Sequence, residues 1–349
     1  MKSTYKISNN DIVHQENRRF QSFRDENSGK KICILYGNCH MSAIRDVLQL
    51  VPSFIDSYTI FPVKAIQEVK SPAYFQSEAF HTCDVFIHQS IQLNNRYGKE
   101  YASDNIIKQL RYGCQVISVP NLYHLPICFF PQYTSEEEFM WQGSTVFFRD
   151  ALLDFAYNRG YRLQEALELY RGKKKPQEVW RLLNLDDMFE SFVRKVRMRE
   201  EDWNIKIVDF ILENYQSQQL FFDPNHPTPV LIKQIAKGIL HYLNIRFEED
   251  YLDSLDVLRL DAYEMPICSA VKEHFHMAFD QEIMRLTGKK VMQIPMDISK
   301  YIKQYWAMEW QNQELSLTKR AVSYFRFIVY KVYNKYSGLK KHLKRGKDI

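Results

Sequence analysis

The stretch Lys31-Ile-Cys-Ile-Leu-Tyr-Gly-Asn-Cys-His40 decides how the first half of the chain folds. Its apolar part, Ile32–Tyr36, has the length and composition of a buried strand, and the helical pattern of Met41–Val51 follows. Gly37 between them permits a tight turn from strand to helix. Side chains just after this turn lie over the helix N-terminus, where free N–H groups and the helix dipole favour an anion. We therefore expect Cys39 to be a better nucleophile than a buried cysteine and to mark the reaction site.

Short apolar strands and helices alternate along the first half of the chain and again after residue 218. We expect further strands at Phe54–Ile60, Asp84–His88, Cys114–Val119 and Gln219–Phe222, and helices at Val63–Val69, Ser103–Tyr112 and Val230–Leu243. This order predicts an α/β fold with a doubly wound, mostly parallel sheet. Right-handed crossovers then place the carboxyl ends of all strands along one edge, where ligands bind.

Between the fourth and fifth predicted strands the pattern changes to helices. We expect them at Ser144–Tyr157, Leu163–Arg171, Gln177–Leu185 and within Asp186–Tyr215. The chain is thus expected to contain one α/β domain, residues 31–250, with a helical insertion at 134–218. Residues 1–30 are polar and are expected to form a partly ordered lead-in. Residues 251–349 are expected to be a mostly helical C-terminal region with a basic tail.

The 349 residues carry a formal net charge of +5, and the excess is greatest in Lys331–Ile349, after the aromatic segment Ala321–Tyr333. One interpretation is a packed C-terminal helix with a solvated end, and another is a peripheral contact with an anionic membrane. No recognised nucleic-acid motif accompanies the charge, so we expect no nucleic-acid partner. No apolar run reaches the roughly 18 residues of a spanning helix, and the first 30 residues lack the apolar stretch of a signal peptide. These features predict a cytoplasmic protein, with the inner membrane face as the site of any peripheral contact.

Six cysteines are present, and no two of them have CxxC spacing: Cys33, Cys39, Cys83, Cys114, Cys128 and Cys268. Structural zinc sites usually show close ligand pairs, so we expect no metal. In a cytoplasmic protein these residues are expected to be reduced thiols, most of them in the core.

Two strand ends carry the residue types that acyl transfer needs. Cys39 follows Gly37-Asn38, and Asp223 precedes His226 by three positions. Cys39 is a candidate nucleophile, or the group that positions a thioester; His226 is a candidate general base that Asp223 orients. The backbone N–H of Cys39, with the amide of Asn38 or Asn121, could stabilise an oxyanion.

Three further polar residues are candidates for binding a substrate at the same edge. Gln89 follows the third strand, Asn225 lies beside His226, and His40, on the first helical turn, could contact a substrate phosphate. Simpler interpretations exist as well. Cys39 could be a core thiol, and Asp223–Pro229 could be a proline-stiffened loop that only caps the next helix.

A nucleophile followed by a late Asp-x-x-His resembles the SGNH (GDSL-type) hydrolases and acyltransferases, although Asn38 and Cys39 replace their aspartate and serine. The chain more closely resembles the WcbI-type polysaccharide biosynthesis family. It shares the order of three motifs between Lys31 and Leu243: Gly37-Asn38-Cys39, Pro120-Asn121-Leu122-Tyr123 and Asn225-His226-Pro227. This resemblance implies an SGNH/flavodoxin-like sheet.

The resemblance also implies an acetyltransferase that moves an acetyl group from acetyl-coenzyme A to a sugar hydroxyl during capsule or surface polysaccharide assembly. Its partners would be an acyl-CoA donor and a saccharide acceptor. Two other functions are compatible with the same residues. One is an SGNH-like thiol esterase or deacetylase, and the other is a non-catalytic protein that binds at the membrane surface.

Overall fold

The computed structural model describes residues 8–122, 132–141, 144–172, 183–257, 260, 263–279, 284–287, 293–296, 299–300, 302–303 and 305. By its internal contacts the chain divides into two units, 1–298 and 299–349. All helices and strands named below belong to the first unit. The basic segment Lys331–Ile349 lies outside the described residues.

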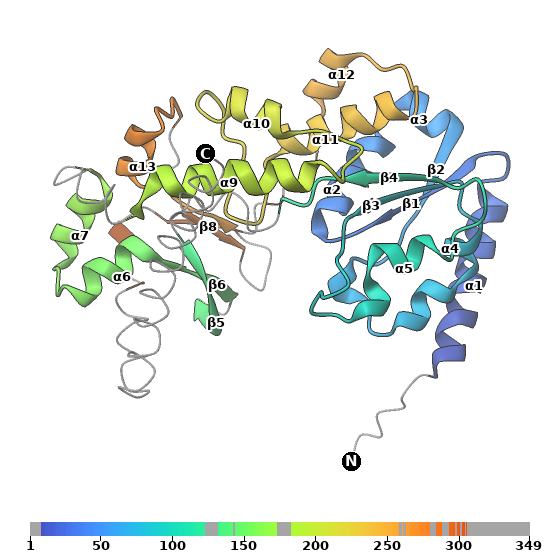
Figure 1. Cartoon of the computed structure of the whole chain (residues 1–349), viewed down its shortest axis with the longest axis horizontal. Helices are drawn as coiled ribbons and strands as arrows, with labels where there is room; N and C mark the ends of the chain where they lie inside the picture. The colour runs from blue at the N-terminus through green and yellow to red at the C-terminus, as the bar shows by residue number, and fades with distance from the viewer. Residues whose placement is uncertain are drawn as a thin grey trace, which may run out of the picture. The chain divides into compact units, whose positions relative to one another are not determined.

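A four-stranded parallel sheet organises the first unit (Figure 1). Its strands are β1 (Lys31–Tyr36), β2 (Tyr58–Phe61), β3 (Val85–Gln89) and β4 (Gln115–Val119), in the order β2-β1-β3-β4. The last residue of β1, Tyr36, pairs with His88, the next-to-last residue of β3. Because β2 and β3 lie on opposite sides of β1, the strand order reverses there, and α/β proteins bind ligands at such a point.

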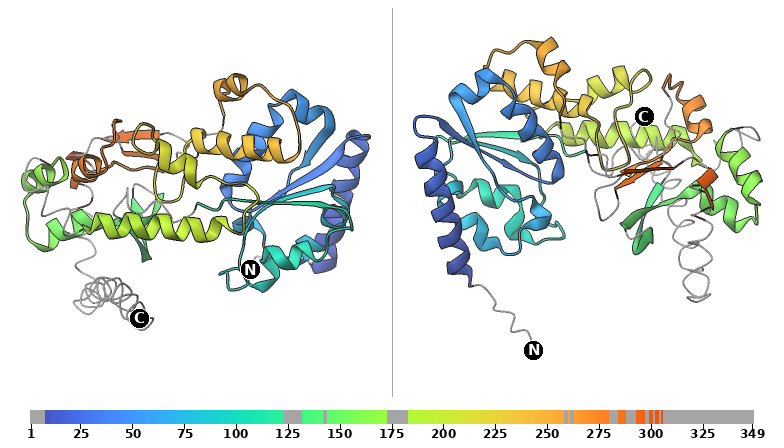
Figure 2. Two further views of the ribbon diagram at one scale, coloured as in Figure 1. Left: turned by 45° about the horizontal axis from the view of Figure 1, so that its top comes forward. Right: turned by 180° about the vertical axis from the view of Figure 1, so that it is seen from behind.

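Helices cover both faces of this sheet, as the expected double winding requires (Figures 1 and 2). α2 (Cys39–Gln49) and α11 (Pro229–Tyr242) pack side by side over one face. On the other side, α1 (Asn9–Glu26) packs against α4 (Glu78–Thr82), with α5 (Ser103–Ile107) beside them. Since α2 begins at Cys39 and α11 begins three residues after His226, their packing brings the two predicted catalytic segments together.

The N-terminal segment, for which we predicted a partly ordered lead-in, contains the helix α1 among its described residues. Ser8 and Asp11 form a capping box at the start of α1, which satisfies two of its free backbone N–H groups. Phe20 is fully buried and packs edge-on against Phe61, with ring centroids 5.1 Å apart. A few apolar residues on one side of a charged helix were enough to dock it.

Two predictions around the second strand were wrong in their bounds. Pro52 begins a short helix, α3 (Pro52–Ser57), so that β2 starts only at Tyr58. In place of the helix predicted at Val63–Val69 there is a single 3₁₀ turn, Ile66–Glu68. α5 is likewise shorter than the predicted helix at Ser103–Tyr112.

The insertion is not entirely helical. The strands β5 (Gln132–Trp141) and β6 (Ser144–Asp150) pair antiparallel, and β-branched residues such as Thr145 and Val146 favour a strand. Asp150 then caps a helix with its carboxylate. In the part of this stretch that the structure describes, the helices that follow are α6 (Ala151–Asn158), α7 (Leu163–Tyr170), α9 (Leu185–Glu200) and α10 (Val208–Asn214). The predicted helix Gln177–Leu185 lies largely outside the described residues.

The predicted fifth strand, Gln219–Phe222, does not join the sheet. The segment turns back on itself: Phe221 forms an isolated bridge with Pro227, and the N–H of Phe222 donates to the carbonyl of His226 at 2.8 Å. A closed loop therefore replaces the strand, and α11 leaves it directly. The loop still carries Asp223 and His226 to the carboxyl edge of the sheet.

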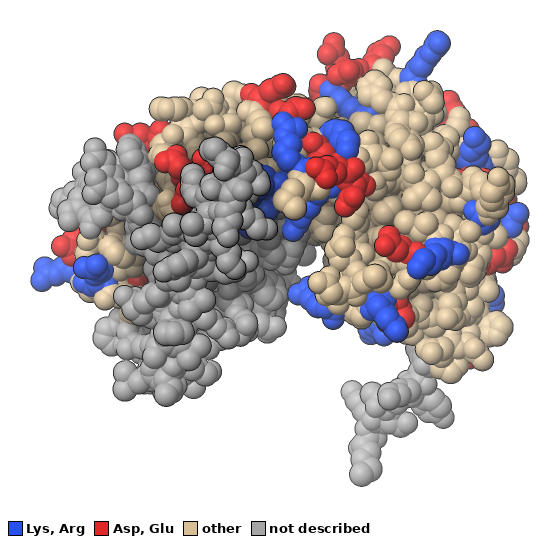
Figure 3. All heavy atoms as spheres, viewed as in Figure 1, with Lys and Arg blue, Asp and Glu red and all other residues tan. Residues whose placement is uncertain are grey.

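The described residues after Asp250 form short strands as well as helices; the prediction that residues 251–349 are mostly helical concerns many residues outside the described ones. α12 (Glu249–Ser254) and α13 (Ser269–His274) accompany an antiparallel sheet of β7 (Tyr263–Glu264), β8 (Met284–Thr287) and β9 (Gln293–Met296). Within the described residues, no helix is both long and apolar enough to cross a membrane. On the face in Figure 3, basic and acidic side chains of the described residues alternate without a continuous field of one sign.

Candidate active site

The turn after β1 is held so closely that only glycine fits at its first position. A Cβ on Gly37 would lie 2.7 Å from Cγ of Met41 and collide with Oε1 of Gln89. Gln89 cannot move aside, because it is fully buried and hydrogen-bonded on both sides of its amide. The carbonyl of Gly37 also accepts a hydrogen bond from the N–H of Ile66 at 2.9 Å.

Asn38 caps helix α2 and thereby places Cys39 at the first helical position. Oδ1 of Asn38 accepts from the N–H of His40 at 2.9 Å. Cys39 is partly exposed, whereas Cys33, Cys83 and Cys268 are buried. As the first residue of the helix, Cys39 has a backbone N–H with no acceptor inside the helix. The turn thus presents a thiol and a backbone donor together.

The loop after Phe222 holds an aspartate and a histidine in direct contact. Asp223 is fully buried, and its Oδ1 accepts from the N–H groups of Asn225 at 2.6 Å and His226 at 3.0 Å. Its Oδ2 pairs with Nδ1 of His226 at 2.7 Å. One carboxylate therefore shapes the loop and fixes the tautomer and orientation of the imidazole.

His226 connects this aspartate to Cys39. With Nδ1 bound to Asp223, the ring also makes a side-chain hydrogen bond with Cys39. Burial lowers the pKa of His226, but the contacts with Asp223 and Cys39 outweigh it and raise the pKa to about 10. Asp223, His226 and Cys39 form a chain of three groups in which the imidazole carries a proton at neutral pH.

His40 is part of the support of this site. The residue is 2% exposed. Nε2 of its ring lies 2.6 Å from the carbonyl oxygen of Asn225, and Nδ1 lies 3.3 Å from Nε2 of Gln89. Burial and the nearby His226 lower the pKa of His40 to about 3, so that its ring is neutral. Nε2–H then donates to Asn225, and Nδ1 accepts from Gln89. We predicted a substrate contact for His40, but both ring nitrogens are engaged within the protein, and the residue holds the loop against α2.

Gln89 joins three chain segments at the sheet edge. Its Oε1 accepts from the N–H of Asn38 at 2.9 Å, and its Nε2 donates to the carbonyl of Pro120 at 3.2 Å as well as to His40. The side chain is fully buried, so it positions the turn rather than lining an open pocket as predicted. Ser103 supports it in turn, since its hydroxyl donates to the carbonyl of Gln89 at 2.7 Å. Sequence reasoning missed Ser103, which gave only the signal of a helix start.

Two asparagines complete the predicted set. Asn121 follows Pro120 at the end of β4, beside the segment that Gln89 holds. Asn225 is 6% exposed, and among the described residues its Oδ1 has no hydrogen-bond partner. The structure thus gathers into one contact network the residues Gly37, Asn38, Cys39, His40, Gln89, Asp223, Asn225 and His226.

Other places in the described residues are less suited to chemistry. No group of three or more His, Cys, Asp or Glu side chains there could hold a metal ion. A cavity of about 230 Å³ lies beside α11 and is lined by Asn204, Lys237 and Glu249 among others. Lys237 already pairs with Glu249 and Asp253, and none of the residues of the network lines this cavity.

Comparison with known proteins agrees with this architecture. A solved structure described as native WcbI, a novel polysaccharide biosynthesis enzyme, without a disulfide bond between COA and one of its cysteines, has a TM-score of 0.68. It is 18% identical and covers 88% of this chain and 97% of its own, which shows a shared fold. No curated protein matches the chain. The family model described as polysaccharide biosynthesis enzyme WcbI matches residues 32–248, a range that holds every predicted site residue. The chain therefore belongs to the WcbI family of polysaccharide biosynthesis enzymes.

Proposed function

We propose that this protein is an acyltransferase that moves an acetyl group from acetyl-coenzyme A to a sugar hydroxyl of a capsule or surface polysaccharide precursor. The observation that carries the proposal is the chain of contacts from Asp223 through His226 to Cys39. Membership of a polysaccharide biosynthesis family supports a saccharide acceptor, and the COA of the similar structure supports a coenzyme A donor. The order of Cys39, Asp223 and His226 along the chain supports an SGNH-like site in which a thiol takes the place of the serine.

In the first step Cys39 attacks the thioester carbonyl. The thiolate of Cys39 forms a bond to the acetyl carbon, and the bond from that carbon to the coenzyme A sulfur breaks. The protonated His226 gives its Nε2 proton to the departing thiolate, so that free coenzyme A leaves. The charge of Asp223, 2.7 Å from Nδ1, keeps the imidazole oriented throughout.

In the second step the sugar hydroxyl attacks the acetyl-cysteine. Once Cys39 is acylated, it no longer helps to raise the pKa of His226, and burial still lowers that pKa. The imidazole is then a suitable base for the hydroxyl proton. The sugar oxygen binds the acetyl carbon, the Cys39 sulfur leaves as a thiolate, and the starting ion pair returns. The contact between Cys39 and His226 thus gives the imidazole a higher pKa in the first step, where it donates a proton, than in the second, where it accepts one.

The developing oxyanion needs donors near Cys39. The backbone N–H of Cys39 lies at the N-terminus of an 11-residue helix, where the dipole also favours negative charge. The amides of Asn38 and Asn121 are further candidates, and Asn225 is a candidate for orienting the acceptor. These assignments predict that Asn38→Ala, which also removes the cap of α2, lowers kcat more than it raises KM.

The direct test is acetyl transfer by the purified protein, measured as coenzyme A release in the presence of saccharide acceptors. Cys39→Ala and His226→Ala should each abolish transfer, while Cys268→Ser, at a buried cysteine outside the site, should retain it. Full activity in both alanine variants would disprove the mechanism.

A thiol esterase or deacetylase would use the same three residues with water as the acceptor. Calorimetric titration with coenzyme A separates the two functions, because a hydrolase has no need to bind it. Binding that persists in Cys39→Ala supports the transferase, and its absence from the wild-type protein supports the hydrolase. The cytoplasmic location and the membrane contact of the basic tail remain predictions, which cell fractionation with and without residues 331–349 would test.

A further inference from the structure

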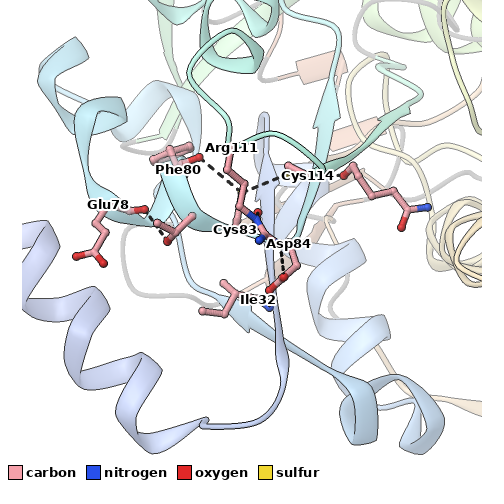
Figure 4. A network of polar contacts seen from close by, with 9 residues as sticks. Ile32, Glu78, Phe80, Cys83, Asp84, Arg111 and Cys114 are labelled. Atoms are coloured by element: carbon pink, nitrogen blue, oxygen red, sulfur yellow. Dashed lines mark hydrogen bonds and ion pairs between the residues drawn. The ribbon is translucent and has the colours of Figure 1, made fainter.

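Two neighbouring thiols lie at the opposite edge of the sheet from Cys39. Cys83 comes two residues before β3, and Cys114 directly precedes β4. Their Sγ atoms are 3.7 Å apart, which is van der Waals contact (Figure 4). A disulfide has a sulfur–sulfur length of about 2.05 Å, so the two atoms need to approach by only about 1.7 Å. Small rotations of the two side chains can supply such a movement.

The backbone around both cysteines is held in place by one ion pair. Arg111 pairs with Asp84 and donates from Nε to the carbonyl of Cys83 at 3.1 Å (Figure 4). Asp84 in turn accepts from the N–H of Ile32 at 2.7 Å, and the N–H of Cys114 donates to the carbonyl of Arg111 at 3.2 Å. These contacts keep the two thiols side by side in the folded protein.

The two thiols differ in access and in charge. Cys83 is fully buried, whereas Cys114 is partly exposed. The hydrogen bond between them lowers the pKa of Cys114 and raises that of Cys83, and the guanidinium of Arg111 also lowers the pKa of Cys114. Cys114 is therefore the thiol that a small oxidant reaches first and the one better able to react as a thiolate. Cys83 lies where its sulfur can attack an oxidised sulfur of Cys114.

We propose that Cys83 and Cys114 are a reversible oxidation site that forms an intramolecular disulfide when the protein meets a peroxide. The thiolate of Cys114 attacks one peroxide oxygen, the O–O bond breaks, and Cys114 becomes a sulfenic acid while the other oxygen leaves as water after taking up a proton. The Cys83 sulfur then attacks the Cys114 sulfur, the S–O bond breaks, and a second water leaves with the thiol proton. Two thiols lose two electrons, and hydrogen peroxide gains them. A thiol reductant reverses the bond by exchange.

This site is independent of the acyl-transfer chemistry. Cys83 and Cys114 lie at the amino ends of β3 and β4, whereas Cys39 follows the carboxyl end of β1 in the same parallel sheet. The disulfide can therefore be studied in Cys39→Ala protein, which lacks the thiol of the proposed transferase site. Its formation does not depend on whether the proposed transferase function is correct.

The test is peptide mapping of the full chain after a small molar excess of hydrogen peroxide, with free thiols blocked by iodoacetamide. Wild-type and Cys39→Ala proteins should both yield a linked Cys83–Cys114 peptide that disappears after treatment with dithiothreitol. Cys114→Ser should yield no linked peptide. In Cys83→Ser, a sulfenic acid should persist on Cys114 and react with dimedone.

Cys268→Ser is the matched control, since it removes a buried cysteine that lies elsewhere in the fold. It should form the linked peptide to the same extent as the wild type. The wild-type protein alone can overturn the proposal, whatever the folding of the variants. If iodoacetamide modifies Cys114 as fully after peroxide treatment as before it, or if Cys114 pairs with another cysteine, the two residues are not such a site.

Discussion

The change Asp223→Asn removes the charge behind His226 and keeps the shape of the loop. An asparagine Oδ1 can still accept from the N–H groups of Asn225 and His226, which Asp223 binds at 2.6 Å and 3.0 Å. The partner of Nδ1 at 2.7 Å, however, becomes neutral. In the wild type the pKa of His226 is raised from 6.5 to about 10 against the effect of burial. At about 1.4 kcal/mol per pKa unit, the imidazolium is favoured by about 5 kcal/mol.

Asp223 makes the larger contribution to this raised pKa, ahead of Cys39. Its neutralisation should therefore lower the pKa of His226 by about two units or more. We expect kcat to fall about 100-fold or more, because the imidazole binds its proton less tightly and loses its fixed orientation. NMR titration of the His226 ring and the pH dependence of transfer measure the two effects in the same samples.

Asp84→Asn is the control, because Asp84 is another carboxylate that accepts from a backbone N–H, but it is only partly buried and lies at the other edge of the sheet. It should lower stability and leave kcat within about twofold of the wild type. If Asp223→Asn retains both its kcat and the raised pKa of His226, the aspartate does not act through the imidazole and the mechanism is refuted.

Three further outcomes follow from the structure. Gln89→Met keeps the length of the side chain but leaves the N–H of Asn38, the carbonyl of Pro120 and Nδ1 of His40 without their partner. Urea unfolding should show that the free energy of unfolding falls by about 2–4 kcal/mol. A fall of less than about 0.5 kcal/mol would contradict the role given to Gln89. Gly37→Ala forces a Cβ against Gln89 and Met41, so we expect about 2 kcal/mol of destabilisation and a large loss of transfer. Gly113→Ala has open space around the new Cβ but strains a backbone at φ +83°, so it should cost stability and still keep transfer near the wild-type rate. The folded-state pKa of His226 is raised above the unfolded value, so its contribution to stability is fully present below about pH 6.5 and is lost as the pH rises towards about 10. The urea midpoint of the wild type should therefore fall over this pH range by more than the midpoint of Asp223→Asn. Equal falls in the two proteins would argue against the ion pair between Asp223 and His226.

The α/β core could be predicted from the sequence because its signals are local. Ile32–Tyr36, Asp84–His88 and Cys114–Val119 are short apolar runs between turn residues, and each became a buried parallel strand within one residue of the predicted bounds. Gly37 and Asn38 likewise predict a strand-to-helix turn, because glycine permits a tight turn and asparagine is a preferred helix N-cap. The positions of the candidate nucleophile and base then follow from parallel pairing.

The errors arose where tertiary contacts override local pattern. Leu220–Phe222 has a strand-like composition, but its backbone pairs with its own loop through Phe221 and Pro227. The segment Ser144–Asp150 has apolar residues at spacings that suit either a helix or a strand, and pairing with β5 decided in favour of the strand. α1 has a mostly charged sequence, and its docking depends on Phe20 finding Phe61 forty-one residues later.

The support of the site was harder to predict than its reactive groups. Cys39 and His226 carry recognisable chemistry, whereas the roles of His40 and Gln89 depend on burial that no short motif encodes. Gln89 was expected to line a pocket, and His40 to meet a phosphate. Instead, both side chains form their hydrogen bonds with backbone groups and with each other. A polar residue beside an active-site turn can bind or position, and only the three-dimensional contacts distinguish these roles.

The measurement that tests the central claim most directly is the mass of the intact protein after brief exposure to acetyl-coenzyme A without an acceptor. The account predicts one acetyl group per chain, located on Cys39 by peptide mapping, together with an equal amount of released coenzyme A. Adding the saccharide acceptor should remove the acetyl group, and Cys39→Ala should never acquire it. Transfer at the wild-type rate by Cys39→Ala, with no acetyl group on the wild-type cysteine, would contradict the account.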